Sequence, residues 1–246
     1  MNTRVSVLWV VGFGSFTLAS LVVGARLLAL AARTRALAEA AFGAALFLGG
    51  AGYLLLVLGF RVVAAESAPL PLAVGNLLLH IGSMALAVGT WRVFHPAEHW
   101  PGAVVALIGA VLATSFALRL EYLRVVPPPA SVFWTSTLAG AAAYAWSAAE
   151  SLRYWKMMRR REALGLADRG ITQRFGFWSL CTACAVGMHA ASVAGRVLAG
   201  DAMPPAAVVA SSALGLVAAV SLSLAFFPRR GRARPEHLDA ASHRAR

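Results

Sequence analysis

The sequence predicts an all-α protein, a polytopic bundle of seven transmembrane helices, and three observations support this prediction. First, the 246 residues are 59% apolar and 13% charged, whereas a soluble domain carries about 25% charged residues. Second, the apolar residues gather in segments of roughly 20 residues or more, the length that a helix needs to cross a bilayer. Third, the 22 Lys and Arg residues are concentrated in alternate loops. This composition, with only two cysteines, excludes disordered and disulfide-rich chains.

The apolar segments follow one another, separated by polar or proline-rich breaks. The first segment is about 27 residues long and its basic cluster follows it, so we interpret it as a retained span and not as a cleaved signal peptide. Later segments end at breaks such as Arg61, His95-Pro96 and Pro127-Pro128-Pro129. The predicted spans lie near Val5–Ala32, Ala38–Phe60, Leu70–Phe94, Gly102–Leu120, Ser131–Tyr154, Phe175–Leu198 and Pro205–Phe227.

The basic residues predict the orientation of these spans, because cytoplasmic loops retain Lys and Arg. The N-terminus and the even-numbered loops hold 5 of the 22 cationic residues, whereas the odd-numbered loops and the tail hold 17. We therefore expect the N-terminus outside and the C-terminus in the cytoplasm, which requires an odd number of spans and agrees with seven. The 17 residues are Arg26, Arg33, Arg35, Arg92, Arg153, Lys156, Arg159, Arg160, Arg161, Arg169, Arg174, Arg229, Arg230, Arg232, Arg234, Arg244 and Arg246.

The net charge of +12 is thus interpreted as an orientation signal and not as a nucleic-acid-binding surface. Residues 228–246 form a short basic tail with few apolar residues. We expect this tail to be disordered and the basic face to attract anionic lipids of the inner leaflet. The Ala- and Arg-rich composition suggests a bacterial inner-membrane protein, and assembly into a homo-oligomer stays open.

The first three and the last three spans show a faint internal repeat. A Phe-Gly pair, at residues 42–43 and again at 175–176, begins a span after a basic loop. The next span after each of these ends in a Phe-containing stretch before Pro96 or Pro228. The Phe of the pair and this proline are 54 residues apart in the first case and 53 in the second. These intervals favour two parallel three-helix repeats joined by the fourth span, as occurs in transporters. Alternatively, Phe, Gly and Pro recur because helix ends favour them.

Seven spans in this orientation, with the indicated repeat, resemble the broad transporter–opsin–receptor architecture, which includes microbial rhodopsins and the small sugar-transporting seven-helix proteins. The resemblance covers the topology of residues 5–227. Retinal proteins of this architecture carry a Schiff-base lysine in the seventh span, whereas the sole lysine of this chain is Lys156, at the end of the fifth. We therefore expect no retinal Schiff base.

Polar side chains inside the spans are the candidate functional residues, because they are costly in lipid and face the bundle interior. Asn76 and His80 are four residues apart in the third span, and Ser83 continues the same helical face. His189 lies in the sixth span, with Ser192 one turn further. His80 and His189 are about equally far from the outer ends of their spans, so we expect them at nearly one depth.

Three interpretations of the two histidines stay open. They are hydrogen-bonding groups between packed helices, or they line a ligand pocket together with Asn76 and Ser83, or they ligate a haem b through both imidazoles. We favour packing or a pocket, because two histidines at one depth do not establish that they face each other. No cofactor is therefore predicted, with haem b as the alternative.

Cys181 and Cys184 form a CxxC pair in the sixth span, which redox membrane enzymes use with quinones. The chain has no further cysteine to relay electrons, so small interface residues are the favoured interpretation and a redox pair the alternative. The glycines near residue 12 are expected to permit close helix packing.

Charged residues near the span ends are expected at the surface. Glu150 lies three residues before Arg153 and predicts an interfacial ion pair. Arg119, Glu121 and Arg124 predict a surface network, and residues 95–99, which include two histidines, predict a solvated loop.

The sequence contains no nucleotide-binding loop, no HExxH motif and no histidine in the last span for a zinc hydrolase. The leading hypothesis is a non-enzymatic small-ligand sensor or binding protein with an interior pocket at Asn76, His80, Ser83 and His189. The first alternative is a solute transporter built from two three-helix repeats. The second is a bis-histidine haem b redox protein.

Overall fold

The computed structural model describes residues 3–62, 64, 67–123, 125, 128–200 and 204–227, with the side chains of residues 3–9 and 61 left aside. These residues form seven α-helices and no strand. The helices are α1 (Thr3–Thr34), α2 (Leu37–Arg61), α3 (Pro69–Phe94), α4 (Trp100–Glu121), α5 (Ala130–Ala163), α6 (Arg169–Ala199) and α7 (Pro205–Phe226). The predicted tail, 228–246, lies outside the described residues.

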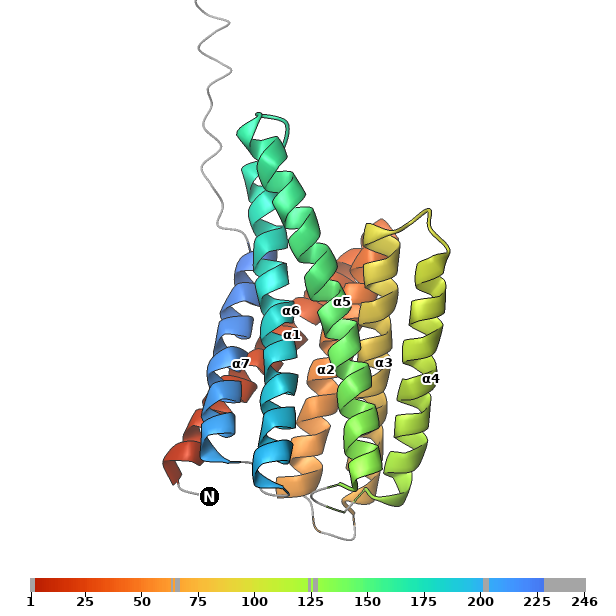
Figure 1. The fold of residues 1–246 in the computed structure, drawn as a ribbon, viewed down its shortest axis with the longest axis vertical. Helices are drawn as coiled ribbons and strands as arrows, with labels where there is room; N and C mark the ends of the chain where they lie inside the picture. The colour runs from red at the N-terminus through yellow and green to blue at the C-terminus, as the bar shows by residue number, and fades with distance from the viewer. Residues whose placement is uncertain are drawn as a thin grey trace, which may run out of the picture.

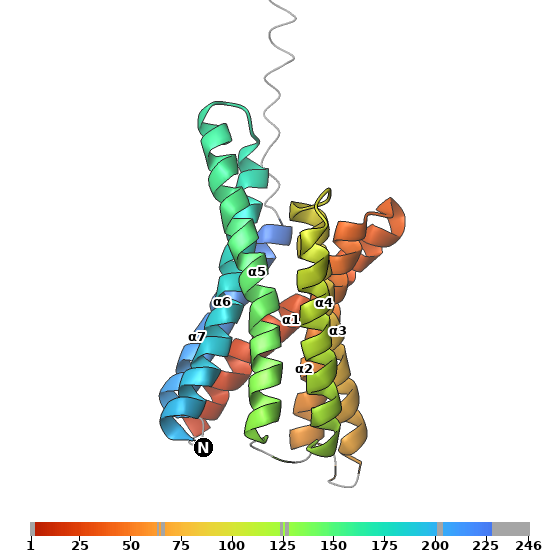
Figure 2. The same ribbon diagram turned by 45° about the vertical axis from the view of Figure 1, so that its right-hand side comes forward.

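The helices pack as a closed ring in which each helix contacts the next in sequence and α7 contacts α1 (Figure 1). One further contact joins α3 to α5, so α4 lies on the outside of these two helices. Figure 2 shows α1 running obliquely across the bundle, where it contacts both α7 and α2. Short loops make consecutive helices antiparallel. The basic loops of the sequence therefore lie at one end of the bundle, uppermost in Figure 1, which we call the basic end.

Six of the helices are long and apolar enough to cross a membrane, which indicates a multi-pass membrane protein. The exception among the described helices is α5, which contains the predicted fifth span. Its second half carries Glu150, Arg153, Lys156 and residues 159–161, all but the first of them basic. It nevertheless packs against α3, α4 and α6 within the ring. The seventh span therefore stays a prediction.

The loop expected between the fifth and sixth spans is largely helical. Helix α5 continues to Ala163 and α6 already begins at Arg169, so the two project together beyond the other helices at the basic end (Figure 1). The amide of Leu166 donates to the carbonyl of Arg161, and the amide of Gly165 donates to that of Glu162. Gly165 has a φ of 72°, so these bonds form the glycine-centred cap that commonly ends a helix. Asp168 then accepts a bond from the Ile171 amide and caps α6.

Small residues hold the ring together, and the close packing predicted for the glycines near residue 12 is found at Gly12. A Cβ added to Gly12 would lie 2.3 Å from the carbonyl oxygen of Ser212 on α7, and one added to Gly52 would lie 2.6 Å from the Gly75 carbonyl on α3. Such approaches let apolar helices gain van der Waals contact where no hydrophobic driving force acts. Gly14, by contrast, faces open space.

The predicted surface network around Arg119 is wrong for Arg119 itself. This side chain is 9% exposed, and its Nη1 has no hydrogen-bond partner among the described residues. The reason is that α4 ends beside α3 and α5, so its last turn faces protein on one side. Arg124 lies outside the described residues.

Candidate functional site

Asn76, His80 and Ser83 of α3 and His189 of α6 all line one interior cavity of about 340 Å³. We call it the central cavity. The structure therefore brings together the four residues that the sequence singled out, although they come from helices that do not contact each other. Their place along α3 and α6 puts the central cavity in the half of the bundle away from the basic end.

Helices α1 to α6 all contribute to the lining of the central cavity. Aromatic rings form part of its wall: Phe13 of α1 stacks on Tyr53 of α2 at 5.4 Å between ring centroids, and Tyr144 of α5 packs on the His189 ring at 5.9 Å. No Asp, Glu, Lys or Arg occurs among the described residues that line it. The site is thus mainly apolar with a few hydrogen-bonding groups, the usual character of a small-molecule pocket.

His80 is held by two hydrogen bonds. Its Nδ1 lies 2.6 Å from the main-chain carbonyl of Asn76, and its Nε2 lies 3.3 Å from the hydroxyl of Ser115 on α4. A carbonyl only accepts, so we assign the proton to Nδ1, and Nε2 accepts from Ser115. The ring orientation of His80 is therefore set by α3 and α4. Ser115 is fully buried and was not identified from the sequence.

His189 is positioned by α5. The Cε1 and Nε2 atoms of its ring would lie 3.1 and 3.4 Å from a Cβ added to Gly140, so the absence of a side chain at Gly140 makes room for the imidazole. The described residues offer its ring nitrogens no hydrogen-bond partner. The ring thus has hydrogen-bonding capacity to offer within the central cavity.

The two histidines are directed at different helices, since Nε2 of His80 lies beside α4 and Nε2 of His189 lies beside α5. Haem ligation by both histidines stays a prediction. Among the described residues no group of three or more His, Cys, Asp or Glu side chains is placed to hold a metal ion.

One buried hydroxyl of the central cavity could not be identified from the sequence. Ser20 of α1 is 3% exposed, and its Oγ has no hydrogen-bond partner among the described residues. A buried polar atom without a partner is costly, and a ligand or water can satisfy it. No sequence signal marks Ser20, because serines occur throughout these apolar helices.

Cys181 and Cys184 are both buried and both free, and they lie in the hydrophobic core beside the central cavity. They pack with Trp178, Ala143 and Leu222. This surrounding suits the packing interpretation, while the redox alternative stays a prediction.

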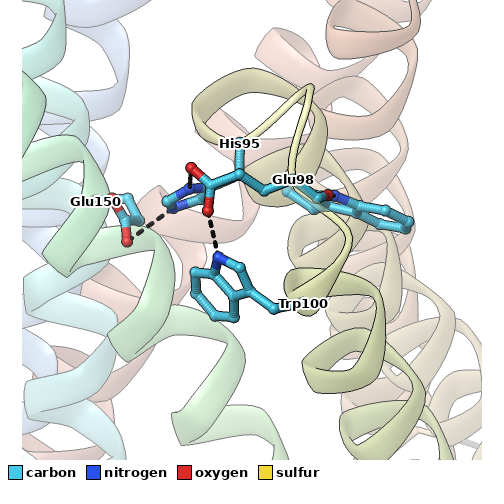
Figure 3. Close-up of polar contacts among 5 residues, drawn as sticks. His95, Glu98, Trp100 and Glu150 are labelled. Carbon is cyan, nitrogen blue, oxygen red and sulfur yellow. Dashed lines mark hydrogen bonds and ion pairs between the residues drawn. The ribbon is translucent and has the colours of Figure 1, made fainter.

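A second polar cluster lies at the basic end, where α3 turns into α4 (Figure 3). Nδ1 of His95 lies 3.2 Å from the Glu98 carboxylate, and Nε2 lies 3.0 Å from the Glu150 carboxylate of α5. Trp100 donates its indole N–H to Glu98, and its ring packs edge-on to the imidazole at 5.1 Å. His95 is only 6% exposed.

This geometry corrects two predictions. His95 is buried and is not part of a solvated loop, and Glu150 pairs with His95 where Arg153 was expected. The reason is that Pro96 turns the chain back after α3, which directs the His95 side chain toward α5. His95 and Glu150 are 55 positions apart in the sequence, so the spacing of residues within one helix could not indicate that they pair.

The two carboxylates control the titration of His95. Burial lowers the pKa of His95, but the adjacent carboxylates of Glu150 and Glu98 outweigh this effect, so the pKa of His95 lies above its ordinary value of 6.5. Hydrogen bonds from Trp100 and His95, together with the charge of Arg153, lower the pKa of Glu98 below 4.5. The two carboxylates therefore favour the imidazolium form of His95.

We expect the stability of the protein to fall on the alkaline side because of His95. A raised pKa means that His95 stabilises the folded state fully below pH 6.5 and that this contribution disappears as the pH rises through the raised value. Because the pKa of Glu98 is lowered, its carboxylate stabilises the folded state fully above pH 4.5, and this stabilisation is lost in more acidic solution. Between these two pH values Glu150→Gln should lower the free energy of unfolding by about 1–3 kcal/mol.

The measurement is the melting temperature in detergent from pH 5 to 9 for the wild type and His95→Gln. The advantage of the wild type should shrink as the pH rises, whereas His99→Gln, at an exposed neighbouring position, should follow the wild type throughout. An advantage that is constant across this interval would show that His95 does not titrate against the carboxylates.

Compared with known protein families, with curated proteins and with solved structures, the chain has no significant match.

Proposed function

We propose that this chain is a membrane-embedded binding protein that takes a small, uncharged, partly apolar solute into the central cavity. One observation carries the proposal: four polar residues, chosen because they lie inside apolar spans, line one cavity of about 340 Å³. Pockets for small molecules begin at about 300 Å³ and combine apolar walls with few polar groups. A sensor uses such a site without moving the solute across the membrane.

The lining favours an uncharged solute. Burying an ion without a partner of opposite charge is strongly unfavourable, and the described lining has no charged side chain. Ser20 and His189 offer hydrogen-bonding capacity, and Tyr144 and Phe13 offer aromatic surface. A planar amide or alcohol with an apolar portion meets both requirements.

The proposed orientation places the basic end in the cytoplasm and the N-terminus outside. Its support is the enrichment of Lys and Arg in the loops of that end, which is how cytoplasmic loops are recognised. The central cavity then lies in the outer half of the bundle.

The test uses benzamide with its charged analogues benzoate and benzamidine, together with glucose. Binding to the purified protein is followed by ligand-detected NMR. We expect benzamide to bind the wild type at least roughly tenfold more tightly than either ion, a difference of about 1.4 kcal/mol. Ser136→Phe places a ring in the central cavity and should abolish binding. Ser131→Phe, on the same helix at an exposed position, should leave it intact.

Two results would contradict the proposal. One is that no neutral probe binds the wild type. The other is equal binding to the Ser136→Phe and Ser131→Phe variants, which would place the binding site elsewhere on the protein.

A second candidate function, solute transport, is favoured by the pattern of helix contacts. If α1, α2 and α3 correspond to α5, α6 and α7, the contact of α7 with α1 has its counterpart in that of α3 with α5. Gly43 of α2 packs on Leu27 and Leu28 of α1, and Gly176 of α6 packs on Trp155 of α5. Both Phe-Gly pairs thus pack on the preceding helix, and α4 lies outside as a linker would.

Transport is distinguished from binding in proteoliposomes. Counterflow of labelled benzamide that the Ser136→Phe variant lacks would favour a transporter, whereas saturable binding without flux would favour the sensor.

A further inference from the structure

A second cavity, of about 430 Å³, lies at the basic end and is separate in its lining from the central cavity. We call it the basic-end cavity. It is lined by the ends of α1, α2, α3, α6 and α7 that meet there. None of its lining residues belongs to the proposed solute site, so a ligand bound there would be independent of the proposed function.

The basic-end cavity has an apolar interior and a charged rim. Val23, Trp178 and Ala225 line it and are all less than 9% exposed. Arg26 and Arg174 line it as well, but both are exposed. A ligand that satisfies this gradient carries its charge at one end and apolar groups at the other.

The charge balance at the rim favours an anion. Two arginines face one carboxylate, that of Glu39, which already accepts a hydrogen bond from the Thr34 hydroxyl. Arg26 is held in place because it donates to the carbonyl of Phe226 at 3.2 Å and lies over the Phe227 ring at 4.7 Å. The guanidinium groups of arginines are well suited to bind phosphate or carboxylate.

Trp178 lines the basic-end cavity and carries a hydrogen-bond donor without a partner among the described residues. Its ring is held edge-on between those of Phe42 and Phe226, at 5.1 and 5.8 Å between centroids. Its indole N–H is buried and has no acceptor among the described residues. A buried tryptophan normally finds such an acceptor, so the orphaned donor points to a ligand oxygen.

We propose that the basic-end cavity binds an anionic phospholipid. Its phosphate lies at Arg26 and Arg174, an ester carbonyl beneath the phosphate accepts from the Trp178 N–H, and part of one acyl chain fills the apolar interior. A phospholipid joins these three features in one molecule: an anionic group, an ester carbonyl that accepts a hydrogen bond, and an apolar chain. Free phosphate would satisfy only the rim.

The experiment titrates the full chain in dodecyl maltoside with short-chain phosphatidylglycerol, phosphatidylcholine or inorganic phosphate. Bound lipid is counted by native mass spectrometry. We expect one tightly bound phosphatidylglycerol, and phosphatidylcholine should bind at least roughly tenfold more weakly. Inorganic phosphate should not displace the bound phosphatidylglycerol. Trp178→Phe keeps the apolar wall and should weaken binding about fivefold, the factor for one neutral hydrogen bond.

Arg26→Gln/Arg174→Gln should abolish the tight site, and Arg174→Gln alone should weaken it without disturbing the bond from Arg26 to α7. The matched control is Arg160→Gln/Arg161→Gln, which removes the same charge from exposed positions at the same end. Equal loss in the control would show a diffuse charge effect and overturn the proposal. Equal binding of phosphatidylcholine, or displacement of lipid by inorganic phosphate, would also overturn it.

Discussion

Gly12→Ala is expected to destabilise the protein, whereas Gly14→Ala on the same helix is not. A Cβ at Gly12 would lie 2.3 Å from the Ser212 carbonyl oxygen, 2.6 Å from its Cα and 2.7 Å from its carbonyl carbon. All three are backbone atoms of α7, which cannot turn aside as a flexible side chain can. The helices must therefore separate, and the expected cost is about 1–3 kcal/mol.

For a chain of this length that cost corresponds to a fall in melting temperature of roughly 2–12 °C. Gly14 has nothing within 4 Å of its added Cβ, so alanine there should leave stability unchanged or raise it by about 0.5–1 kcal/mol through its better helix propensity. Thermal unfolding of the three proteins in one detergent measures the difference. If both variants melt together, α1 and α7 do not approach as closely as these distances require.

The seven helices could be predicted from the sequence because each apolar segment is bounded by charges or prolines. The extension of α5 to Ala163 could not be predicted in this way, because the added residues are mostly charged and a search for apolar segments does not include them. Residues 155–163 are nearly all good helix formers, and Gly165 ends the helix through its positive φ. Helix propensity and a glycine cap are signals that the length of an apolar segment does not include.

The candidate site was partly predictable for a physical reason. Asn76, His80 and His189 stand out because polar groups of this size are rare in apolar spans. Ser20 and Ser115 do not stand out, because a serine hydroxyl can bond back to its own helix and so is common in such segments. The pairing of His95 with Glu150 is not predictable from the sequence, because it depends on how α3 and α5 lie together.

We predict a large difference in thiol reactivity between two serine positions on α5. Ser136 lines the central cavity, and Ser151 is fully buried and does not line it. A cysteine at position 136 is open to a small neutral reagent that enters the cavity. A cysteine at position 151 reacts only after local opening, and an opening that costs about 3 kcal/mol lowers the rate roughly a hundredfold.

The most direct test of the central claim, a solute-accessible cavity between α3, α5 and α6, is therefore the rate at which methyl methanethiosulfonate labels single cysteines. The background is Cys181→Ala/Cys184→Ala, which removes both native thiols. We predict that Ser83→Cys, Ser136→Cys and Ser192→Cys react roughly a hundredfold faster than Ser151→Cys and that benzamide slows the first three. Equal rates at all four positions, or no protection by benzamide, would contradict a solute site in the central cavity.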